Sequence, residues 1–356
     1  MKKIKLLIFS LSLLFFLSAC SINFTGSEKK EVNTDFGGIF KSADKGDTWK
    51  QKVLISGVSQ TRGSLGATSV NNFKFDPSDN KALYYASVSN GLAYTYDGAD
   101  SWQLAKGLGP VPILDVAVDS NSKCRVYAST GNKIFRTEDC SRNWVQVYFD
   151  NEARIKVNSI AIDHFDSSKV YAGLSRGDLL KSSDYGKSWQ TIHRFKVNIS
   201  GILIDPKDSR KMFVITPNNG LYRSVDGGEN WESLKKILTD TKVGNNIRDM
   251  VILNTEPTMI YLASAKGMVK SLDNGSTWEK IELITPDAKS QINAIAVNES
   301  DVNEIYYVTN TTFFKSSDGG VNWTPQKLPT SRAGWKLLVD PEDPKVLYLG
   351  IKALTK

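Results

Sequence analysis

The feature that most constrains this chain is an Asp followed five residues later by a Trp, a pair that recurs seven times. Seven of the eight tryptophans belong to these pairs, and successive aspartates lie 53, 42, 45, 42, 47 and 45 residues apart. A period in the forties is typical of repeat architectures, in which each unit packs on its neighbours. The pairs are Asp44/Trp49, Asp97/Trp102, Asp139/Trp144, Asp184/Trp189, Asp226/Trp231, Asp273/Trp278 and Asp318/Trp323.

Each pair lies in a box with a shared pattern, Gly-apolar-x-(Lys/Arg/Tyr)-(Ser/Thr)-x-Asp-x-Gly-x-(Thr/Ser/Asn)-Trp, as in residues 38–49 and 220–231. Two alternating runs joined by a turn rich in Asp and Gly predict a β-hairpin. We expect the Asp to accept hydrogen bonds from turn amides, and the Trp to supply a large buried surface that pins the turn to its own unit. Ala99 and Ser141 replace the glycine of two boxes, so these turns are expected to be less regular.

A second element lies between the boxes: an apolar run that ends in Asp or Asn, a short polar turn, and a second apolar run often centred on Tyr, as in residues 73–86. Near-continuous apolar runs predict strands buried on both faces. Each unit should therefore hold four antiparallel strands, a and b in this element and c and d in the box. Seven such units predict an all-β, seven-bladed β-propeller.

The two ends of the repeat predict how the ring closes. The chain begins with c and d alone, near residues 37–54, and ends with a and b alone, at residues 335–340 and 346–349. Combined, the halves make one blade. A β-solenoid is the alternative, but it would leave both halves as open edges. One domain is predicted over residues 37–356.

The N-terminus has the features of a secretory signal. A charged segment precedes an apolar run at residues 6–17 that is too short for a transmembrane helix, and small residues follow. Residues 17–20, Leu-Ser-Ala-Cys, resemble the bacterial lipobox. This resemblance implies cleavage before Cys20 and a diacylglycerol on its sulfur, whereas an ordinary signal with a chance Cys is the alternative.

These features predict the organisation of the N-terminal region and the location of the protein. We expect a signal peptide over residues 1–19 and a lipidated flexible tether over residues 20–36, which are polar and lack periodicity. The mature protein would then be a membrane-anchored lipoprotein of the bacterial cell envelope.

The box resembles the Asp-box, also called the bacterial neuraminidase repeat, Ser-x-Asp-x-Gly-x-Thr-Trp. The resemblance covers nearly all of the chain after residue 36. Asp-boxes occur in sialidases, secreted glycoside hydrolases, sortilin-type receptors and photosystem II stability/assembly factors. The last group resembles this chain best, being exported, single-domain, seven-bladed and in some cases lipidated. A resemblance of fold does not by itself assign a function.

Motifs of catalysis and metal binding are not recognisable. The Phe/Tyr-Arg-Ile-Pro motif of sialidases is absent, and Arg62 and Arg154 stand in unrelated contexts. The two histidines, His164 and His193, belong to no cluster with the spacing of metal ligands, and no phosphate loop follows a strand. We expect no cofactor, no metal and no catalytic residue, although acids from distant blades could still cleave a glycan.

Two cysteines remain besides Cys20. Cys124 begins a predicted b strand, and Cys140 lies in the box of the same unit. With the chain reversing near Gly131, antiparallel pairing brings both to the same end of one blade. An exported location permits a disulfide, which we favour over two free thiols and interpret as a structural staple.

We expect the function on the face of the propeller that does not repeat. Turns a–b and c–d, with every Asp-box, lie on one face, whereas the d–a and b–c loops form the other and are longer and more basic. A basic loop face would suit a protein or an anionic glycan, and scattered solvating charges are the alternative. The net charge of +7 without a Lys/Arg run does not indicate nucleic acid. The loop-face cations are Arg62, Lys106, Arg154, Lys156, Arg176, Lys235, Lys236, Lys242, Arg248, Lys266, Lys289, Lys327 and Arg332.

The first residues of the a strands should line the channel entrance on the loop face. This ring is polar and contains Trp335, the one Trp outside a box, which could recognise a sugar or a peptide or could simply fill the closing blade. We predict a monomeric, non-catalytic binding or assembly module, and the alternative is a carbohydrate-active enzyme that uses Asp115 and Asp249. The candidate binding residues are Trp335, Arg332, Lys336, Arg248, Asp249, Asp115 and Arg62.

Overall fold

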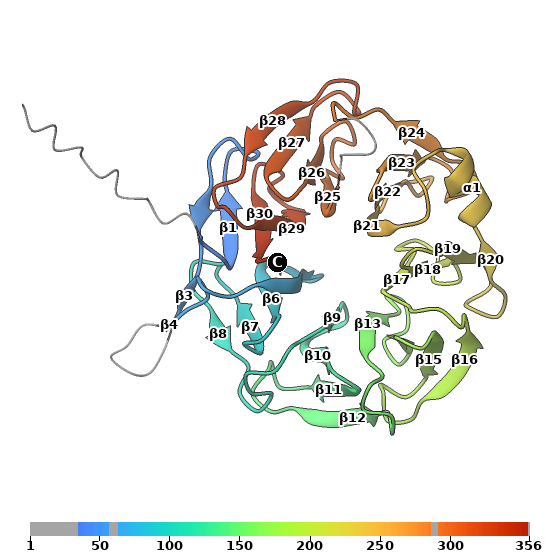
Figure 1. Cartoon of the computed structure of the whole chain (residues 1–356). Helices are drawn as coiled ribbons and strands as arrows, with labels where there is room; N and C mark the ends of the chain where they lie inside the picture. Colours follow the sequence, from blue (N-terminus) through green and yellow to red (C-terminus); the bar gives the residue numbers. More distant parts are fainter. Residues whose placement is uncertain (1–34, 57–62, 286–290, 355–356) are drawn as a thin grey trace, which may run out of the picture. The chain divides into compact units, whose positions relative to one another are not determined.

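The computed structural model describes residues 35–56, 63–285 and 291–354, which form seven four-stranded antiparallel sheets arranged as blades around a central channel (Figure 1). In each of these seven sheets the hydrogen-bonded order is a–b–c–d. The all-β, seven-bladed propeller predicted from the repeat is therefore confirmed.

Blades 1 to 6 are complete in the chain. They are β5 (Val70–Asp76), β6 (Asp79–Ser87), β7 (Leu92–Thr95) and β8 (Gln103–Leu104); β9 (Asp115–Asp119), β10 (Ser122–Thr130), β11 (Lys133–Thr137) and β12 (Val145–Phe149); β13 (Val157–Ile162), β14 (Val170–Leu174), β15 (Asp178–Ser182) and β16 (Gln190–Arg194); β17 (Gly201–Ile204), β18 (Met212–Thr216), β19 (Gly220–Ser224) and β20 (Glu232–Ser233); β21 (Ile247–Ile252), β22 (Ile260–Ser264), β23 (Gly267–Ser271) and β24 (Glu279–Ile281); and β25 (Ala294–Val297), β26 (Ile305–Val308), β27 (Thr312–Ser316) and β28 (Thr324–Lys327).

Blade 7 closes the ring as predicted. It combines β29 (Ala333–Val339) and β30 (Leu347–Lys352) with β1 (Ile39–Ser42) and β2 (Lys50–Gln51). β1 and β30 pair antiparallel from Ile39↔Gly350 to Ser42↔Leu347. The ends of the described chain are therefore held in one sheet.

Two d–a loops contain additional secondary structure. A short hairpin, β3 (Leu54–Ile55) with β4 (Gly63–Ser64), precedes blade 1, and α1 (Lys235–Asp240) lies between blades 4 and 5. Within the described ranges, α1 is the one helix, and no helix is long and apolar enough to cross a bilayer.

The core lies between blades. One cluster, for example, combines Tyr127 of blade 2 with Val157 and Ile160 of blade 3, and the box residue Trp189 packs against it. Trp189 Nε1 also donates to the Val147 carbonyl of blade 2 at 3.1 Å.

Two other box tryptophans make the same kind of bond. Trp102 donates to the Lys52 carbonyl at 3.0 Å, and Trp323 donates to the Glu282 carbonyl at 2.9 Å. In each case the acceptor belongs to the preceding part of the ring. The sequence prediction confined each Trp to its own unit, but these indoles also join a blade to its neighbour.

The other four box tryptophans also depart from the predicted burial within one unit. Trp49, Trp144, Trp231 and Trp278 are each only half-buried, as Trp189 is, whereas Trp102 and Trp323 are buried. Each of the seven directly precedes a d strand, the outermost strand of its blade.

The buried part of these four indoles packs on the preceding blade. Trp49 meets Phe313 of blade 6 edge-to-face, with 5.4 Å between the ring centroids. Trp144, Trp231 and Trp278 pack against clusters that contain Tyr84 of blade 1, Tyr171 of blade 3 and Phe213 of blade 4, respectively. These tryptophans therefore fill the seams between blades rather than the interior of one unit.

The indole nitrogens of the four also differ among themselves. Trp231 Nε1 donates to the Gly228 carbonyl at 3.0 Å and Trp278 Nε1 to the Gly275 carbonyl at 3.1 Å, both inside their own boxes. Nε1 of Trp49 and of Trp144 is buried and has no hydrogen-bond partner within the described ranges. What the box tryptophans share is thus packing on the neighbour, not a single hydrogen bond.

The Asp-box is held by a repeated set of hydrogen bonds. In the first box, Asp44 accepts from the Thr48 amide at 2.8 Å and from the Thr48 hydroxyl at 2.6 Å, while Ser42 Oγ donates to Asp44 at 2.7 Å and accepts from the Gly46 amide at 2.8 Å. The side chains of the box itself therefore satisfy the amides of the turn, as the sequence predicts for the Asp.

The two boxes without glycine keep the same bonds, contrary to the expectation of less regular turns. The Ala99 amide donates to Thr95 Oγ1 at 3.3 Å, and the Ser141 amide donates to Thr137 Oγ1 at 3.2 Å. Ala99 and Ser141 have φ of 71° and 69°, in the left-handed region that disfavours any residue with a Cβ. The turn geometry therefore prevails over the local preference of these residues.

Replacing Ser141 with glycine should stabilise the protein. The substitution Ser141→Gly relieves the left-handed strain, so the free energy of unfolding should rise by about 1 kcal/mol. Urea denaturation measures the change. The matched variant Gly186→Ala should be destabilised, because Gly186 has φ of 81° and a Cβ there would lie 3.2 Å from Tyr127 Cε1. A destabilised Ser141→Gly protein would contradict the assignment of strain.

The Asp-boxes should also make the fold sensitive to acid. Hydrogen bonds from the Thr, Ser or Asn four residues later are the main cause that lowers the pKa of five box aspartates from 3.8 to about 2. These are Asp44, Asp139, Asp184, Asp226 and Asp318.

A folded-state pKa below the unfolded one adds stability that is fully present above pH 3.8 and is lost as the pH falls toward about 2. We therefore expect unfolding free energy to fall within that window, with a shallower fall in Asp226→Asn. Circular dichroism along an acid titration gives the measurement. A pH-independent stability between these values would show that the boxes do not couple to folding.

Candidate functional site

A cavity of about 390 Å³ opens where the a strands begin, at the centre of the loop face. The start of each of the seven a strands contributes at least one residue to it, as predicted, and we call this site the channel mouth. Its ring residues are Asn71, Asn72, Leu114, Asp115, Asn158, Ser159, Ser200, Gly201, Arg248, Asp249, Asn293, Trp335 and Lys336.

Three asparagines of the ring join neighbouring blades. Asn71 Nδ2 donates to the Ile113 carbonyl at 2.8 Å, Asn158 Nδ2 to the Ile199 carbonyl at 3.0 Å, and Asn293 Nδ2 to the Gly334 carbonyl at 2.9 Å. The sequence analysis predicted a polar ring that binds a ligand and did not foresee that these asparagines join the blades. The signal available in the sequence was Asn at the same strand position of three units.

The candidate carboxylates Asp115 and Asp249 also join blades. Asp115 Oδ2 accepts from the Ile160 amide at 2.9 Å, and Asp249 Oδ2 accepts from the Ile295 amide at 3.1 Å. The Ser159 hydroxyl accepts from the next blade in the same way.

A lysine neutralises each of these carboxylates. Lys74 Nζ lies 3.0 Å from Asp115 Oδ1, and Lys336 Nζ lies 2.9 Å from Asp249 Oδ1. The Asp115 and Asp249 side chains are only 5% and 11% exposed. Both carboxylates are engaged by the ring itself, and so is the candidate Lys336.

The candidate Arg332 is likewise engaged in contacts within the protein. Its guanidinium lies 2.7 and 3.1 Å from the two carboxylate oxygens of Asp35 and donates to the backbone carbonyls of Ala67 and Thr68. The hydrogen bond from Arg332 lowers the pKa of Asp35 and raises the pKa of Arg332. The structure thus gives Arg332 the role of holding the start of the propeller.

Trp335 both packs and lines the channel mouth. The indole is half-buried against the cluster that contains Ile39 and Phe73, and it also contributes to the cavity wall. Lys352 Nζ lies 4.1 Å from the ring centroid, and burial lowers the pKa of Lys352. The Trp335 indole is therefore already in contact with a cation of the protein itself, the Lys352 ammonium.

Arg248 differs from its neighbours. It is exposed, it lines the channel mouth, and its guanidinium has no ion-pair partner among the described residues. It is thus the ring cation that is available to a ligand.

The cavity extends toward the seam between blades 4 and 5. On the blade 4 side its wall includes Ile202, Ile215 and Pro217, and on the other side Asn246–Met250. In the described chain, no hydrogen bond joins β17 to β21 in the way that Asp115, Ser159 and Asp249 join other a strands. Instead Leu234, Leu238 and Val243 of the α1 insertion pack between these blades.

The basic loop face is partly neutralised. Arg176 Nη2 lies 2.7 Å from Asp150 Oδ2, and Arg176 Nε lies 2.7 Å from Asp178 Oδ2. Arg154 pairs with Glu152, and Lys236 pairs with Asp240. The predicted loop-face cations that are exposed and have no ion pair in the described part of the chain are Lys106, Lys156, Lys235, Lys242, Arg248, Lys266 and Lys327.

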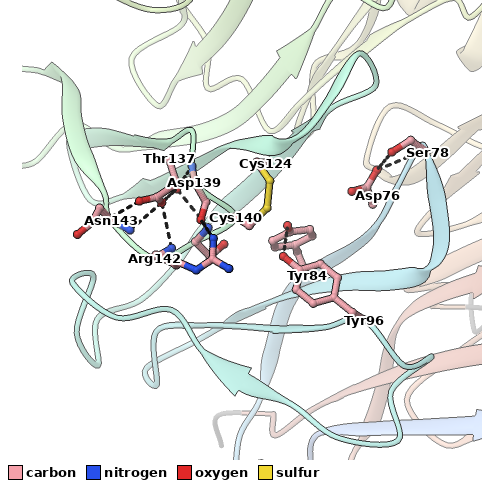
Figure 2. Close-up of a disulfide and its surroundings, with 11 residues drawn as sticks. Asp76, Ser78, Tyr84, Tyr96, Cys124, Thr137, Asp139, Cys140, Arg142 and Asn143 are labelled. Carbon is pink, nitrogen blue, oxygen red and sulfur yellow. Dashed lines mark hydrogen bonds between the residues drawn. A yellow bond between two sulfur atoms is a disulfide. The ribbon is translucent and has the colours of Figure 1, made fainter.

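Cys124 and Cys140 form a disulfide that joins β10 to the Asp-box turn of blade 2 (Figure 2). In the same turn, Asp139 accepts from the Asn143 amide and side chain at 2.8 and 2.7 Å. The disulfide staples one blade at its Asp-box end, away from the channel mouth.

Several predicted features cannot be placed. Arg62, Lys289, Cys20, the signal peptide and most of the tether lie outside the described residues. Among the residues that are described, no group of three or more His, Cys, Asp or Glu side chains could hold a metal ion.

Comparison with known proteins places the chain among Asp-box propellers. A family model described as "Photosynthesis system II assembly factor YCF48" matches residues 18–205. A search of curated proteins gives no match.

Solved structures of two kinds share the fold. A GH74 enzyme from Niastella koreensis is 17% identical with a TM-score of 0.63, and the match covers 84% of this chain but only about half, 53%, of that one. A structure of YCF48 bound to D1 peptide is 16% identical with a TM-score of 0.60, covering 81% of this chain and 94% of that one. YCF48 from Cyanidioschyzon merolae is 13% identical with a TM-score of 0.61, covering 83% and 97%. At these identities the likeness concerns the fold.

Removing the Asp115 carboxylate should weaken the ring. The substitution Asp115→Ala leaves the buried Ile160 amide unpaired, so we expect a loss of about 2 kcal/mol in unfolding free energy. Asp115→Asn retains an acceptor and should cost less. The exposed Glu342→Ala serves as control and should change the urea midpoint little. An unchanged midpoint for Asp115→Ala would contradict the structural role.

Proposed function

Because the chain belongs to the family of the photosynthesis system II assembly factor YCF48, we propose that it is a non-catalytic propeller that binds a protein partner during assembly of a complex. The proposal includes its place: an exported lipoprotein of the bacterial cell envelope, anchored through Cys20. The residues 17–20 that resemble a lipobox support this place.

The channel mouth is the observation that carries the proposal. A cavity of about 390 Å³ is within the range of ligand-binding pockets and can take a few side chains of a polypeptide. Its wall combines apolar Ile202, Ile215 and Met250 with the exposed Arg248. A guanidinium recognises a carboxylate through two parallel hydrogen bonds. The site therefore suits a segment in which an acidic group lies next to an apolar side chain.

The family comparison supports a peptide as the ligand class. One similar structure is that of YCF48 bound to D1 peptide, so a propeller of this family holds a polypeptide segment. That partner belongs to the relative, and the partner of this chain is to be identified by experiment.

The enzymatic alternative has weaker support at the residues proposed for it. GH74 enzymes share the fold, but in the example given the match covers about half of the enzyme at 17% identity. Asp115 and Asp249 each accept a backbone amide through one carboxylate oxygen and pair with a lysine through the other, so both carboxylates are already engaged within the ring.

Site-specific photo-crosslinking in the native envelope tests the binding proposal. A photoreactive residue replaces Lys266, which is exposed on the loop face, and the captured partner is identified. We expect Arg248→Ala to lower the adduct yield about tenfold because it removes a charge-assisted bond, and Arg248→Lys to restore part of it. Lys345→Ala on the opposite face should leave the yield unchanged.

Three outcomes would oppose the proposal of a protein partner at the channel mouth. Equal capture by wild type and Arg248→Ala would remove the channel mouth from the interface. Capture of a glycan, with reducing ends released in the presence of the wild type but not of Asp249→Asn, would favour the enzymatic alternative. A glycan captured without turnover would make the ligand an anionic envelope polymer.

A further inference from the structure

The channel has a second opening where the a strands end, on the Asp-box face. Two cavities of about 330 and 200 Å³ lie there, and they share Phe75 and Glu299 in their walls. The larger one also shares Lys74, Ile202 and Leu203 with the channel mouth. The walls of the two cavities together include residues of all seven blades, and we call this end of the channel the far mouth.

The wall of the far mouth is mainly apolar, unlike the polar ring of the channel mouth. One apolar residue from the end of each a strand lines it, among them Phe75, Val118, Ile162 and Ile204. An apolar wall that is open to solvent favours contact with an apolar group of a ligand.

The charge that remains at the far mouth is negative. The lysines of its wall are neutralised toward the other end of the channel, where Lys74 pairs with Asp115 and Lys336 pairs with Asp249. Glu299, in contrast, is exposed and has no ion pair among the described residues. Its Oε1 accepts from the Asn254 amide at 3.3 Å, so the side chain is oriented by the neighbouring turn while its charge stays unpaired.

Two buried carboxylates beside the far mouth add to this negative charge. Asp76 and Asp205 are 2% and 0% exposed, and in the sequence each lies between two residues of the cavity wall. In the described chain, these are the two carboxylates with a buried oxygen, Oδ2, that has no hydrogen-bond partner. Burial raises the pKa of Asp76. A buried carboxylate that lacks a donor is costly, so a positive charge in the adjacent cavity would stabilise it.

Acidic a–b turns extend the negative charge beyond the cavities. The turns of blades 5, 6 and 7, residues 253–259, 298–304 and 340–346, contain seven Asp or Glu and one Lys. Those that are exposed and have no ion pair among the described residues are Glu256, Glu299, Asp301, Glu342 and Asp343. The unpaired charge therefore covers three neighbouring turns, a wider area than a single ammonium group can contact.

We propose that the far mouth is a second binding site, and that its ligand is a polypeptide segment in which a lysine or arginine lies next to an apolar side chain. The apolar side chain would cover the wall, and the cation would pair with Glu299 and the neighbouring turns. The channel mouth presents Arg248 and favours an acidic group, so the two ends of the channel select segments of opposite charge. This site goes beyond the function proposed above and does not depend on it.

Binding of synthetic peptides to the whole protein tests the site. The probe is the fluorescein-labelled peptide Ser-Leu-Lys-Phe-Arg-Ser, and fluorescence anisotropy measures its affinity. The matched peptide Ser-Leu-Glu-Phe-Glu-Ser reverses the charge, and Ser-Ser-Lys-Ser-Arg-Ser removes the apolar side chains. We expect both to bind at least about tenfold more weakly, because the first meets like charge and the second leaves the apolar wall uncovered.

Removal of charge from the far mouth should weaken binding of the probe. Glu299→Gln keeps an oxygen for the Asn254 amide but loses the charge, so we expect a loss of about threefold, and of about tenfold when Glu256→Gln and Glu342→Gln are added. Glu229→Gln is the matched control. Glu229 is exposed in the Asp-box of blade 4, away from the a–b turns, and its replacement should leave the affinity unchanged.

Crosslinking locates the bound peptide and completes the test. A benzoylphenylalanine in place of the Phe of the probe should label the a–b turns around the far mouth. Labels on the loop face, or no saturable binding up to about 1 mM peptide, would overturn the site. Equal affinity of the probe and the peptide without apolar side chains would reduce the interaction to adsorption on an acidic surface. Displacement by less spermidine than unlabelled probe would make the ligand a small polyamine and overturn the assignment to a polypeptide.

Discussion

The open edge of each innermost strand is the constraint on which the channel depends. An a strand pairs with its b strand on one side only, so its other edge presents backbone groups that require partners once buried. Side chains of the preceding blade provide them: Asp115 and Asp249 accept amides, and Asn71 donates to a carbonyl. The polar ring around the channel mouth is therefore first a joint between blades, and only then a surface for a ligand.

This requirement also explains where a binding function can reside. Once the ring has used its carboxylates, asparagines and two lysines, Arg248 remains exposed without an ion pair among the described residues. It lies at the seam of blades 4 and 5, where apolar residues of the α1 insertion replace the hydrogen-bonded joint. The seam at which no hydrogen bond joins the a strands is thus also the place where a guanidinium, that of Arg248, has no ion pair among the described residues.

The sequence was sufficient to predict the propeller because its signals are local and repeated, whereas the candidate site depends on contacts between blades. The closing pair of β1 with β30 followed from the half-units at the two ends and is confirmed, and Arg248, Asp249 and Asp115 were correctly brought to one cavity. Their partners were not foreseeable: Asp249 binds an amide 46 residues away, and Arg332 binds Asp35, 297 residues away. The box tryptophans pack on neighbouring blades for the same reason, since no spacing within one unit reveals the closed ring.

Ring closure also determines how the protein bears force. A pull on the chain N-terminal to residue 35 acts along β1, whose four pairs with β30, from Ile39↔Gly350 to Ser42↔Leu347, are then loaded together in shear. The Asp35–Arg332 ion pair and the Thr330 bond to Phe36 take the load before the sheet does. The contacts of Asp35 and Phe36 thus protect the blade that closes the ring from mechanical tension.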